Sequence, residues 1–424
     1  MLGIVMFITT LLLLMVGVPV AFVFGATSLF FAFISPDVGV DIFNFLPYRI
    51  YGVMQNTTLM AVPLFILMGL ILQKSKMAEN LLKTMSYILR GVKGGLALSV
   101  VVVGVILATT TGIVGASVVM MGVIALPVMM KYNYDQSLAS GTVLASGTLG
   151  QIIPPSIILI ILGDVMSVSV GDLFRSAVIP SAILVSLYIA YILYSTSKSG
   201  DIVILDRESG GTALEMISAT FPPFILMFTV LGTIFLGIAT PTESASIGVI
   251  GAIFLTLLNR SFSIKLLKDA GEETLKITGM IFIILFGATA FSLVFNELGG
   301  TDLIVEFFTE SVESKTLFIV IAMLLIFVLG FFIDFVEIAF VVVPILLPVV
   351  NAFGIDPLWF AILLAINLQT SFLTPPFGFA LFFLKGAVGD MIDTVKMYKG
   401  VLPFIAIQLI TLLLIAFFPA ILIF

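Results

Sequence analysis

The 424 residues are 61% hydrophobic and 10% charged, with a mean hydropathy of +1.29 and a formal net charge of −6. Soluble domains are about 45–50% apolar and about 25% charged, so this composition excludes a soluble fold and predicts a membrane-embedded chain. Neither Cys nor His is present, which excludes disulfides, thiol chemistry, His-ligated metals, His-containing catalytic triads and His proton relays. No basic tract suggests a nucleic-acid partner.

Apolar stretches long enough to cross a bilayer recur along the whole chain. The first, 3–34, lacks the basic start and cleavage site of a signal peptide, and we interpret it as mature protein. As one helix it would measure about 50 Å against a hydrocarbon core of about 30 Å. Because it contains Gly17 and Pro19, it predicts either two crossings or one bent crossing. The predicted spans are 3–34, 58–72, 94–130, 136–167, 176–194, 220–238, 244–259, 277–296, 316–350, 358–386 and 399–424.

The polar segment KSGDIVILDRESGG divides the chain, and we predict repeat 1 at 1–194, a linker at 195–219 and repeat 2 at 220–424. LPVMMKYNYD precedes SGTLGQIIPPS in the first half, as LPVVNAFGID precedes NLQTSFLTPPFG in the second. The spacing between matching residues is constant (348 − 127 = 221) for the pairs Pro127 and Pro348, Asp135 and Asp356, Pro154 and Pro375, and Pro155 and Pro376. This shared offset predicts an internal duplication.

Loop charges predict that the two copies are inverted. The spans 58–72 and 277–296 look equivalent, yet bases follow the first span and precede the second. Basic loops stay on the cytoplasmic side, so equivalent helices would cross in opposite directions, as in inverted-repeat transporters; chance loop charge is the alternative. Helical spacing within 74–93 predicts an amphipathic arm on the membrane surface, with an inverted counterpart at about 300–315.

Each half places its Pro-Pro pair inside an apolar span, which predicts broken helices at 136–167 and 358–386. Bare backbone at membrane depth is tolerated only inside protein or beside a water-filled cavity. The breaks at 146–156 and 367–378 would therefore offer carbonyls to Na⁺ and a helix N-terminus to a carboxylate. The alternative is a proline kink that serves only packing.

Re-entrant hairpins are predicted upstream of the breaks, at about 94–130 and 316–350, with tips near ATTTGIVGAS and GFFIDFVEIA. Asp334 and Glu337 stand in the second tip, and ionisable residues at membrane depth indicate function. Asp334 would balance Na⁺, fix the hairpin, or act as a cap at the water interface. In ATPTESAS, Thr240 and Glu243 fit a capping box, and Glu243 equally fits pairing with a base or lining the site.

Enzyme motifs are missing: the sequence has no HExxH motif, no P-loop and no serine with a His partner, so we expect no enzymatic activity. Without a nucleotide-binding domain, transport must be driven by an ion gradient or by a partner. Two other hypotheses remain, a self-sufficient ion-coupled anion symporter or exchanger, and a membrane subunit of an electron-transfer or assembly complex. The latter would be expected to show cofactor ligands such as His pairs.

The ordered motifs GASVVMMGVIALPVM, YDQSLASGTVLASGTLGQIIPPSI, GDLFRSAVIPS, ATPTESASIG and GIDPLWFAILLAINLQTSFLTPPFG span essentially the whole chain. In this combination the chain resembles the large membrane subunit of TRAP (tripartite ATP-independent periplasmic) transporters of bacteria and archaea. The resemblance implies an all-α polytopic membrane protein with an elevator-type, ion-transporter-like architecture in the cytoplasmic (inner) membrane. It implies Na⁺-coupled uptake of an organic acid, with Na⁺ as coupling ion and no organic cofactor. The implied partners are a small four-helix membrane subunit and a periplasmic substrate-binding protein.

The resemblance also implies which residues bind sodium and substrate. They are Thr111, Gly112, Gly115, Ser117, Ser146, Gly147, Thr148, Pro154, Pro155, Glu243, Asp334, Asn367, Thr370, Thr374, Pro375 and Pro376. The chain departs from the common pattern at the first tip, where GAS replaces a more hydroxyl-rich run, and at the second, where Glu337 is an extra acid. The form LQTSFLTPPFGFALF resembles the branch associated with 2-oxo acids or related monocarboxylates.

Overall fold

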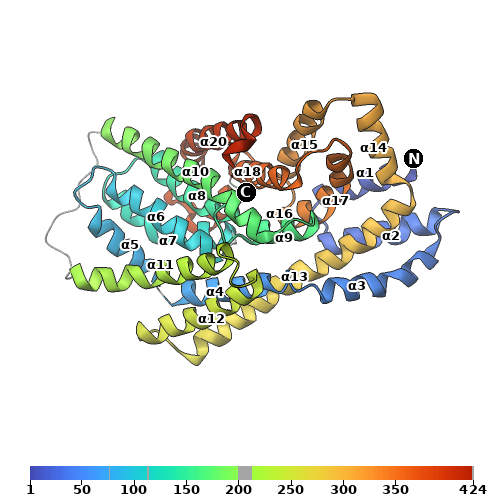
Figure 1. Ribbon diagram of the computed structural model, residues 1–424. Helices are drawn as coiled ribbons and strands as arrows, with labels where there is room; N and C mark the ends of the chain where they lie inside the picture. The colour runs from blue at the N-terminus through green and yellow to red at the C-terminus, as the bar shows by residue number, and fades with distance from the viewer. Residues whose placement is uncertain (76, 112–113, 199–212, 423–424) are drawn as a thin grey trace.

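The computed structural model describes residues 1–75, 77–111, 114–198 and 213–422, and over these residues it is entirely helical (Figure 1). The predicted all-α class is confirmed. The described part of the chain holds six helices that are long and apolar enough to cross a membrane, alongside several shorter apolar helices. The long ones are Val114–Lys131, Val170–Lys198, Pro241–Leu258, Ile264–Glu297, Phe335–Ala352 and Thr394–Phe417.

The first apolar span forms two helices, α1 (Leu2–Met15) and α2 (Val20–Ile34), rather than one bent helix. Gly17 adopts a φ of +87° in the turn between them, a conformation that favours glycine. The two helices pack against each other, and the Thr10 hydroxyl donates to the Thr27 hydroxyl at 3.1 Å. The sequence had left both readings open, and the helical hairpin is the one observed.

The 221-residue offset extends from single prolines to whole helices. The pairs are α5 (Met77–Ile88) with α14 (Gly300–Glu306) and η3 (Phe307–Val312), α6 (Gly95–Thr111) with α15 (Lys315–Leu329), α7 (Val114–Lys131) with α16 (Phe335–Glu337), η4 (Ile338–Val342) and α17 (Val343–Ala352), α8 (Gln136–Thr148) with α18 (Pro357–Leu373), α9 (Ile157–Val165) with α19 (Phe379–Val388), and α10 (Val170–Lys198) with α20 (Thr394–Phe417). Asp135 and Asp356 each accept a backbone N–H as the N-cap of α8 and α18. The predicted duplication is confirmed helix by helix.

One pair of equivalent segments differs between the repeats. In repeat 1, α3 (Leu46–Met54) and α4 (Ala61–Lys74) are separate, whereas their counterparts form one 34-residue helix, α13 (Ile264–Glu297). At 1.5 Å per residue α13 is about 51 Å long, which exceeds the bilayer core. Hydropathy predicted only 277–296, because the first third of α13 is charged. Its buried residues Leu266, Ala270 and Thr274 recur every four positions, which is the periodicity of an amphipathic helix.

The repeats are interlocked rather than placed side by side. Helix α2 packs on α13, and its counterpart α12 (Pro241–Leu258) packs on α4. In the same way α8 packs on α20, and α18 packs on α10. Helix α11 (Ala213–Phe235) lies against α12 and α5. Each helix of these pairs therefore buries part of its apolar surface on the other repeat.

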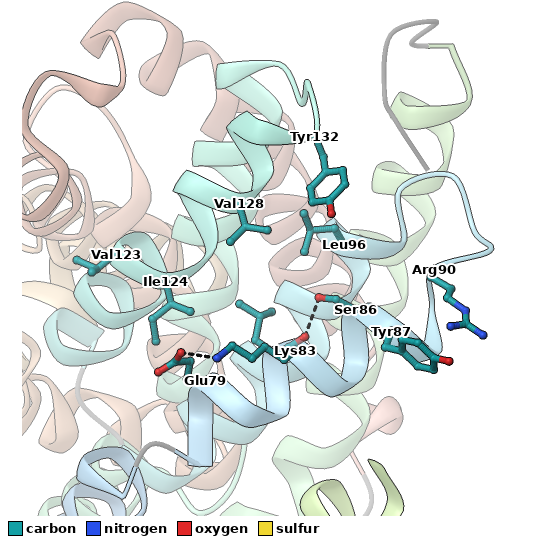
Figure 2. A pocket seen from close by; sticks show the side chains of 11 residues that line it. Glu79, Lys83, Ser86, Tyr87, Arg90, Leu96, Val123, Ile124, Val128 and Tyr132 are labelled. Atoms are coloured by element: carbon teal, nitrogen blue, oxygen red, sulfur yellow. Dashed lines mark hydrogen bonds and ion pairs between the residues drawn. The ribbon is translucent and has the colours of Figure 1, made fainter. Parts of the chain in front are cut away.

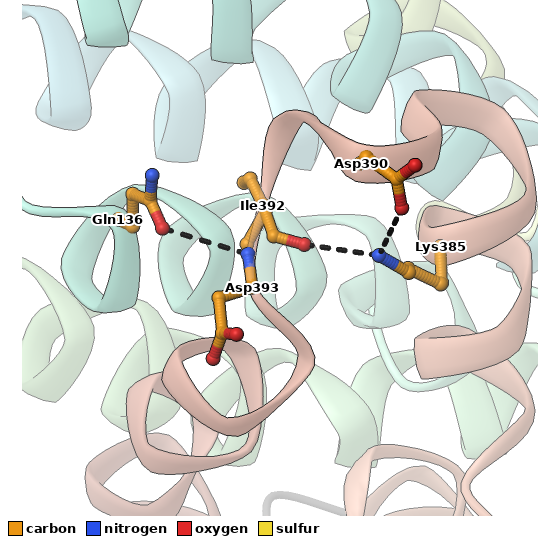
Figure 3. Close-up of polar contacts among 5 residues, drawn as sticks. All are labelled: Gln136, Lys385, Asp390, Ile392 and Asp393. Atoms are coloured by element: carbon orange, nitrogen blue, oxygen red, sulfur yellow. Dashed lines mark hydrogen bonds and ion pairs between the residues drawn. The ribbon is translucent and has the colours of Figure 1, made fainter.

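Polar contacts at the helix ends define two faces of the molecule. At one face, Lys74 pairs with Glu273 at 2.7 Å, and the Thr196 hydroxyl donates to the Lys93 carbonyl at 3.2 Å. The Asp393 N–H at the start of α20 donates to the Gln136 side chain at 3.5 Å (Figure 3). We call this the basic face, because the helix ends and loops that reach it carry Lys74, Lys93, Lys131, Lys198, Arg260 and Lys385.

A second set of contacts lies at the opposite face, before α4, at the end of α9 and at the start of α12. There the Asn56 amide donates to Asp164, and the Thr242 hydroxyl donates to the Thr57 carbonyl at 2.6 Å. This acidic face carries Asp164, Asp172, Glu243, Glu297, Asp302, Glu306, Glu310 and Glu313. Because basic loops stay in the cytoplasm, the basic face is cytoplasmic. The arm helix α5 lies at this face and its counterpart α14 at the other, so the predicted inversion is confirmed.

Candidate functional site

The first break interrupts a helix inside the protein. Helix α8 ends at Thr148, a 3-10 turn follows over Leu149–Gln151, and α9 begins at Ile157. The peptide bond between Pro154 and Pro155 is cis, and every residue from 146 to 156 is buried. Ser156, the N-cap of α9, makes no side-chain cap bond; its hydroxyl donates instead to the Gln151 carbonyl at 2.7 Å. The first N–H groups of α9 are therefore left without a side-chain cap.

The second break has the same plan but is more open. Helix α18 ends at Leu373 with Thr374 as C-cap, the bond between Pro375 and Pro376 is again cis, and α19 begins at Phe379. The N-cap of α19 is a glycine and offers no side chain. Pro376 is exposed, whereas its counterpart Pro155 is buried. One break is thus sealed and the other reaches the surface.

The first hairpin lies directly on the first break. Gly147 approaches the backbone of Val118 so closely that a Cβ would stand 3.0 Å from the Val118 Cα. Near the tip, a Cβ on Gly115 would meet the Phe383 ring of α19 at 3.0 Å. Ser117 is buried on the same helix, α7. Thr111 ends α6, and Gly112 lies outside the described residues.

The second hairpin repeats this arrangement. Gly330, the C-cap of α15, lies against the second broken helix, and a Cβ there would stand 2.1 Å from the Ser371 hydroxyl. The descending helix of this hairpin, through α16 and η4, packs on α9. Each hairpin therefore contacts the break of its own repeat and the second half-helix of the other. Because α18 also packs on the 3-10 turn after α8, the two breaks lie close together.

Four of the hydroxyls at the breaks donate to backbone carbonyls of their own helices. Thr148 donates to Ala145 at 3.0 Å, Thr370 to Ile366 at 2.8 Å, Thr374 to Thr370 at 2.7 Å and Ser146 to Thr142 at 2.6 Å. A hydroxyl that has given its proton away keeps lone pairs for a cation. Asn367 differs, because its amide nitrogen donates to the Met323 carbonyl of α15 at 2.7 Å and so ties the break to the hairpin.

Asp334 occupies the second hairpin tip as the N-cap of α16. Its carboxylate accepts the Phe335 N–H at 2.7 Å, and its own N–H donates to the Glu337 carboxylate. Glu337, the extra acid of this tip, thereby completes a capping box. Asp334 makes the capping contacts that the sequence allowed, whereas its role in fixing the hairpin stays a prediction. A direct role toward Na⁺ stays a prediction.

Glu243 is held in a second capping box. Its carboxylate accepts the Thr240 N–H at 2.8 Å, and its side chain is exposed at the start of α12. Helix α12 packs chiefly on α4 and α11, so the structure does not bring Glu243 to the breaks.

Three polar side chains, two at the breaks and one within α8, were missed by sequence reasoning. Gln151 is 1% exposed, and Gln369 and Thr142 are fully buried. The side-chain amides of both glutamines and the hydroxyl oxygen of Thr142 have no hydrogen-bond partner among the described residues. An unpaired buried amide costs about 1–3 kcal/mol. The signal was present in SGTLGQIIPPS and NLQTSFLTPPFG, as a glutamine in an otherwise apolar or hydroxyl-bearing stretch.

Comparisons with known proteins give matches over nearly the whole chain. A family model described as the DctM component of the tripartite ATP-independent periplasmic transporter matches residues 7–421. The chain is 28% identical over 408 residues to the sialic acid TRAP transporter large permease protein SiaM of Vibrio cholerae, covering 96% of this chain and 94% of that protein. It is 27% identical over 381 residues to the C4-dicarboxylate TRAP transporter large permease protein DctM of Pseudomonas aeruginosa, covering 89% and 88%.

The fold also has a solved counterpart. The crystal structure of the Alcanivorax borkumensis YdaH transporter matches with a TM-score of 0.66 over 99% of this chain and 98% of that chain. The sequence identity is 15%, so the likeness concerns the fold alone.

Proposed function

Because this chain belongs to the DctM-component family of tripartite ATP-independent periplasmic transporters, as their large membrane subunit, we propose that it couples uptake of a small organic acid to Na⁺ entry. The chain is a multi-pass protein of the inner membrane and a transport permease, not an enzyme. The two relatives are named for sialic acid and for C4-dicarboxylates, which are both carboxylic acids.

The observation that carries the proposal is the set of unpaired polar groups at the two breaks. The amides of Gln151 and Gln369 and the hydroxyl of Thr142 are buried without a partner among the described residues. A buried polar group without a hydrogen-bond partner lowers stability by about 1–3 kcal/mol, and a bound ligand that supplies the partner removes this cost. Beside them, the uncapped N-termini of α9 and α19 favour an anion.

In this mechanism Na⁺ binds where each hairpin meets its break. The hydroxyl oxygens of Thr148, Thr370 and Thr374 and the carbonyls freed by the broken helices supply hard oxygen ligands. The substrate carboxylate lies toward the half-helix N-termini, and the bound Na⁺ compensates its charge. The hairpins and broken helices then move as one body against the scaffold formed by α2, α4, α12 and α13.

The proposal includes two protein partners, a small four-helix membrane subunit and a periplasmic substrate-binding protein that delivers the organic acid. The tripartite description of the matched family supports this.

Sodium binding can be tested before the substrate is known. We expect the thermal unfolding midpoint of the purified chain to be higher in NaCl than in equimolar KCl, because a ligand at 100 times its Kd stabilises by about 2.7 kcal/mol. Equal midpoints in the two salts would contradict Na⁺ binding. In proteoliposomes with both partners, uptake that ignored an imposed Na⁺ gradient would contradict coupling.

The alternative is a self-sufficient ion-coupled symporter or exchanger. Uptake of a carboxylate by proteoliposomes that contain this chain alone, at the rate seen with the binding protein, would favour it. Uptake that requires the binding protein would favour the tripartite assembly.

A further inference from the structure

A pocket of about 560 Å³ lies at the basic face, between the arm helix α5 and the first hairpin. Figure 2 shows α5 with Glu79, Lys83, Ser86 and Tyr87 along one side and Val123, Ile124 and Val128 of α7 along the other. Leu82, Arg90, Leu96 and Tyr132 complete the lining. We call it the arm pocket. Its volume is that of a site for a drug-sized molecule.

The lining of the arm pocket has a polar and an apolar part. On the polar side, Lys83 pairs with Glu79 at 2.6 Å, and the Arg90 guanidinium lies over the Tyr87 ring at 3.6 Å. The Nη1 of Arg90 is shielded from solvent and has no hydrogen-bond partner among the described residues. Two bases against one acid leave one net positive charge in the lining (2 − 1 = 1).

The apolar side comes from α7. Val123 is 52% exposed and Val128 is 37% exposed, so this side of the pocket presents accessible aliphatic side chains. An amphipathic occupant with an anionic end and an aliphatic end matches this lining.

The corresponding place in repeat 2 is filled by the protein itself. There Phe308 of the other arm packs on Phe318 with ring centroids 5.0 Å apart. Phe318 in turn packs on Phe353 at 5.7 Å and on Phe360 at 6.2 Å. These four rings close the gap between arm and hairpin at the acidic face.

The offset of 221 shows which side chains differ at this place between the repeats. Phe308 and Phe353 correspond to Tyr87 and Tyr132, which line the arm pocket, while Phe318 and Phe360 correspond to Ala97 and Ala139. Repeat 1 thus has tyrosine at two of the four positions and alanine at the other two, where repeat 2 has phenylalanine. Repeat 1 therefore lacks the ring cluster of repeat 2, and two tyrosines that replace its phenylalanines line the arm pocket.

We propose that the arm pocket binds one anionic phospholipid of the cytoplasmic leaflet. The anionic headgroup lies along α5 between Lys83 and Arg90, which stand toward opposite ends of the pocket in Figure 2, and an acyl chain follows Val123 and Val128. Basic pockets at the cytoplasmic side of membrane helices suit anionic headgroups, and Arg provides a planar donor set for phosphate. The lipid thus lies between the arm and the hairpin that carries Gly115 and Ser117.

The test is native mass spectrometry of the purified full chain titrated with phosphatidylglycerol or phosphatidylcholine. Wild type is expected to retain one phosphatidylglycerol more tightly than phosphatidylcholine. The double variant Lys83→Gln, Arg90→Gln is expected to bind phosphatidylglycerol about 30-fold more weakly, from the contribution of two bases near an anionic lipid. The matched control is Lys93→Gln, Lys131→Gln, which removes the same charge from the same face outside the pocket.

A steric variant tests the volume independently of charge. Ser86→Phe introduces the residue of repeat 2, since Ser86 corresponds to Phe307, and it is expected to abolish retention while both bases remain. Equal loss in the matched control would reduce the effect to general surface charge and overturn the proposal. So would equal retention of the two lipids, unchanged retention in both pocket variants, or loss of the lipid when a small membrane subunit binds.

Discussion

Asn133 and Gly354 hold the same left-handed backbone conformation, with φ angles of 57° and 58°, at the turns that join each hairpin to its broken helix. Asn and Gly are the residues that adopt this conformation at least cost. We expect Asn133→Val to lower the free energy of unfolding by about 1–2 kcal/mol and Asn133→Gly to leave it nearly unchanged. Thermal unfolding in detergent measures both. Asn351→Val, at an exposed helical position, is the control and should cost little; equal losses at both sites would contradict the backbone explanation.

Because Gly330 packs closely on Ser371, we expect the effect of a substitution at Gly330 to be reversed by a second substitution at Ser371. Gly330→Ala places a Cβ 2.1 Å from the Ser371 hydroxyl and should push hairpin 2 off its break, destabilising by about 1–3 kcal/mol. Adding Ser371→Gly removes the obstructing atoms and should restore the hairpin position, measured as Na⁺-dependent uptake. As a control, Gly279→Ala in α13 meets nothing within 4 Å and should stabilise. Failure of the second substitution to restore uptake would show that the contact is not the cause.

Replacing Gln369 by leucine should move stability and transport in opposite directions. The buried amide has no partner among the described residues, so Gln369→Leu removes an unpaired polar group and should raise the unfolding midpoint in KCl. If the amide is a ligand in the transport site, the same variant should lose the additional stabilisation by NaCl, and its uptake should fall. Parallel loss of stability and uptake would instead assign Gln369 a packing role.

The buried pair of Tyr188 and Gln408 fastens α10 to α20. The Gln408 amide donates to the Tyr188 hydroxyl at 2.8 Å, and its oxygen has no partner among the described residues. Tyr188→Phe should therefore cost about 1–3 kcal/mol, because it strands the remaining half of the amide. The double variant Tyr188→Phe, Gln408→Leu should recover most of that loss in a thermal unfolding series. Additive losses would argue against coupling between the two side chains.

Much of the fold was predictable because proline, glycine and charge act locally. The Pro-Pro pairs predicted the breaks, the offset predicted the repeats, and the loop bases predicted the inversion, all of which the structure contains. Hydropathy failed for the start of α13, where buried Leu266 and Ala270 alternate with charges, and for the short helix α3.

The site was harder to predict than the fold. A D-x-x-E sequence is compatible with an ion ligand or with a capping box, and only the geometry around Asp334 and Glu337 distinguishes the two. The amides of Gln151 and Gln369 were overlooked because a hydropathy window averages one polar side chain into its apolar neighbours. Whether they lack a partner depends on contacts far away in the chain, which no local pattern records.

The interlocking of the two halves has a consequence for how the protein is made. Because α2 packs on α13 and α8 packs on α20, the first half lacks part of its packing surface until the second half has entered the membrane. The N-terminal half therefore lacks part of the packing of its broken helix, the part that α20 supplies, while some two hundred further residues are synthesised. The linker therefore separates the two repeats in the sequence but not in folding, and we expect the two halves to fold as one unit.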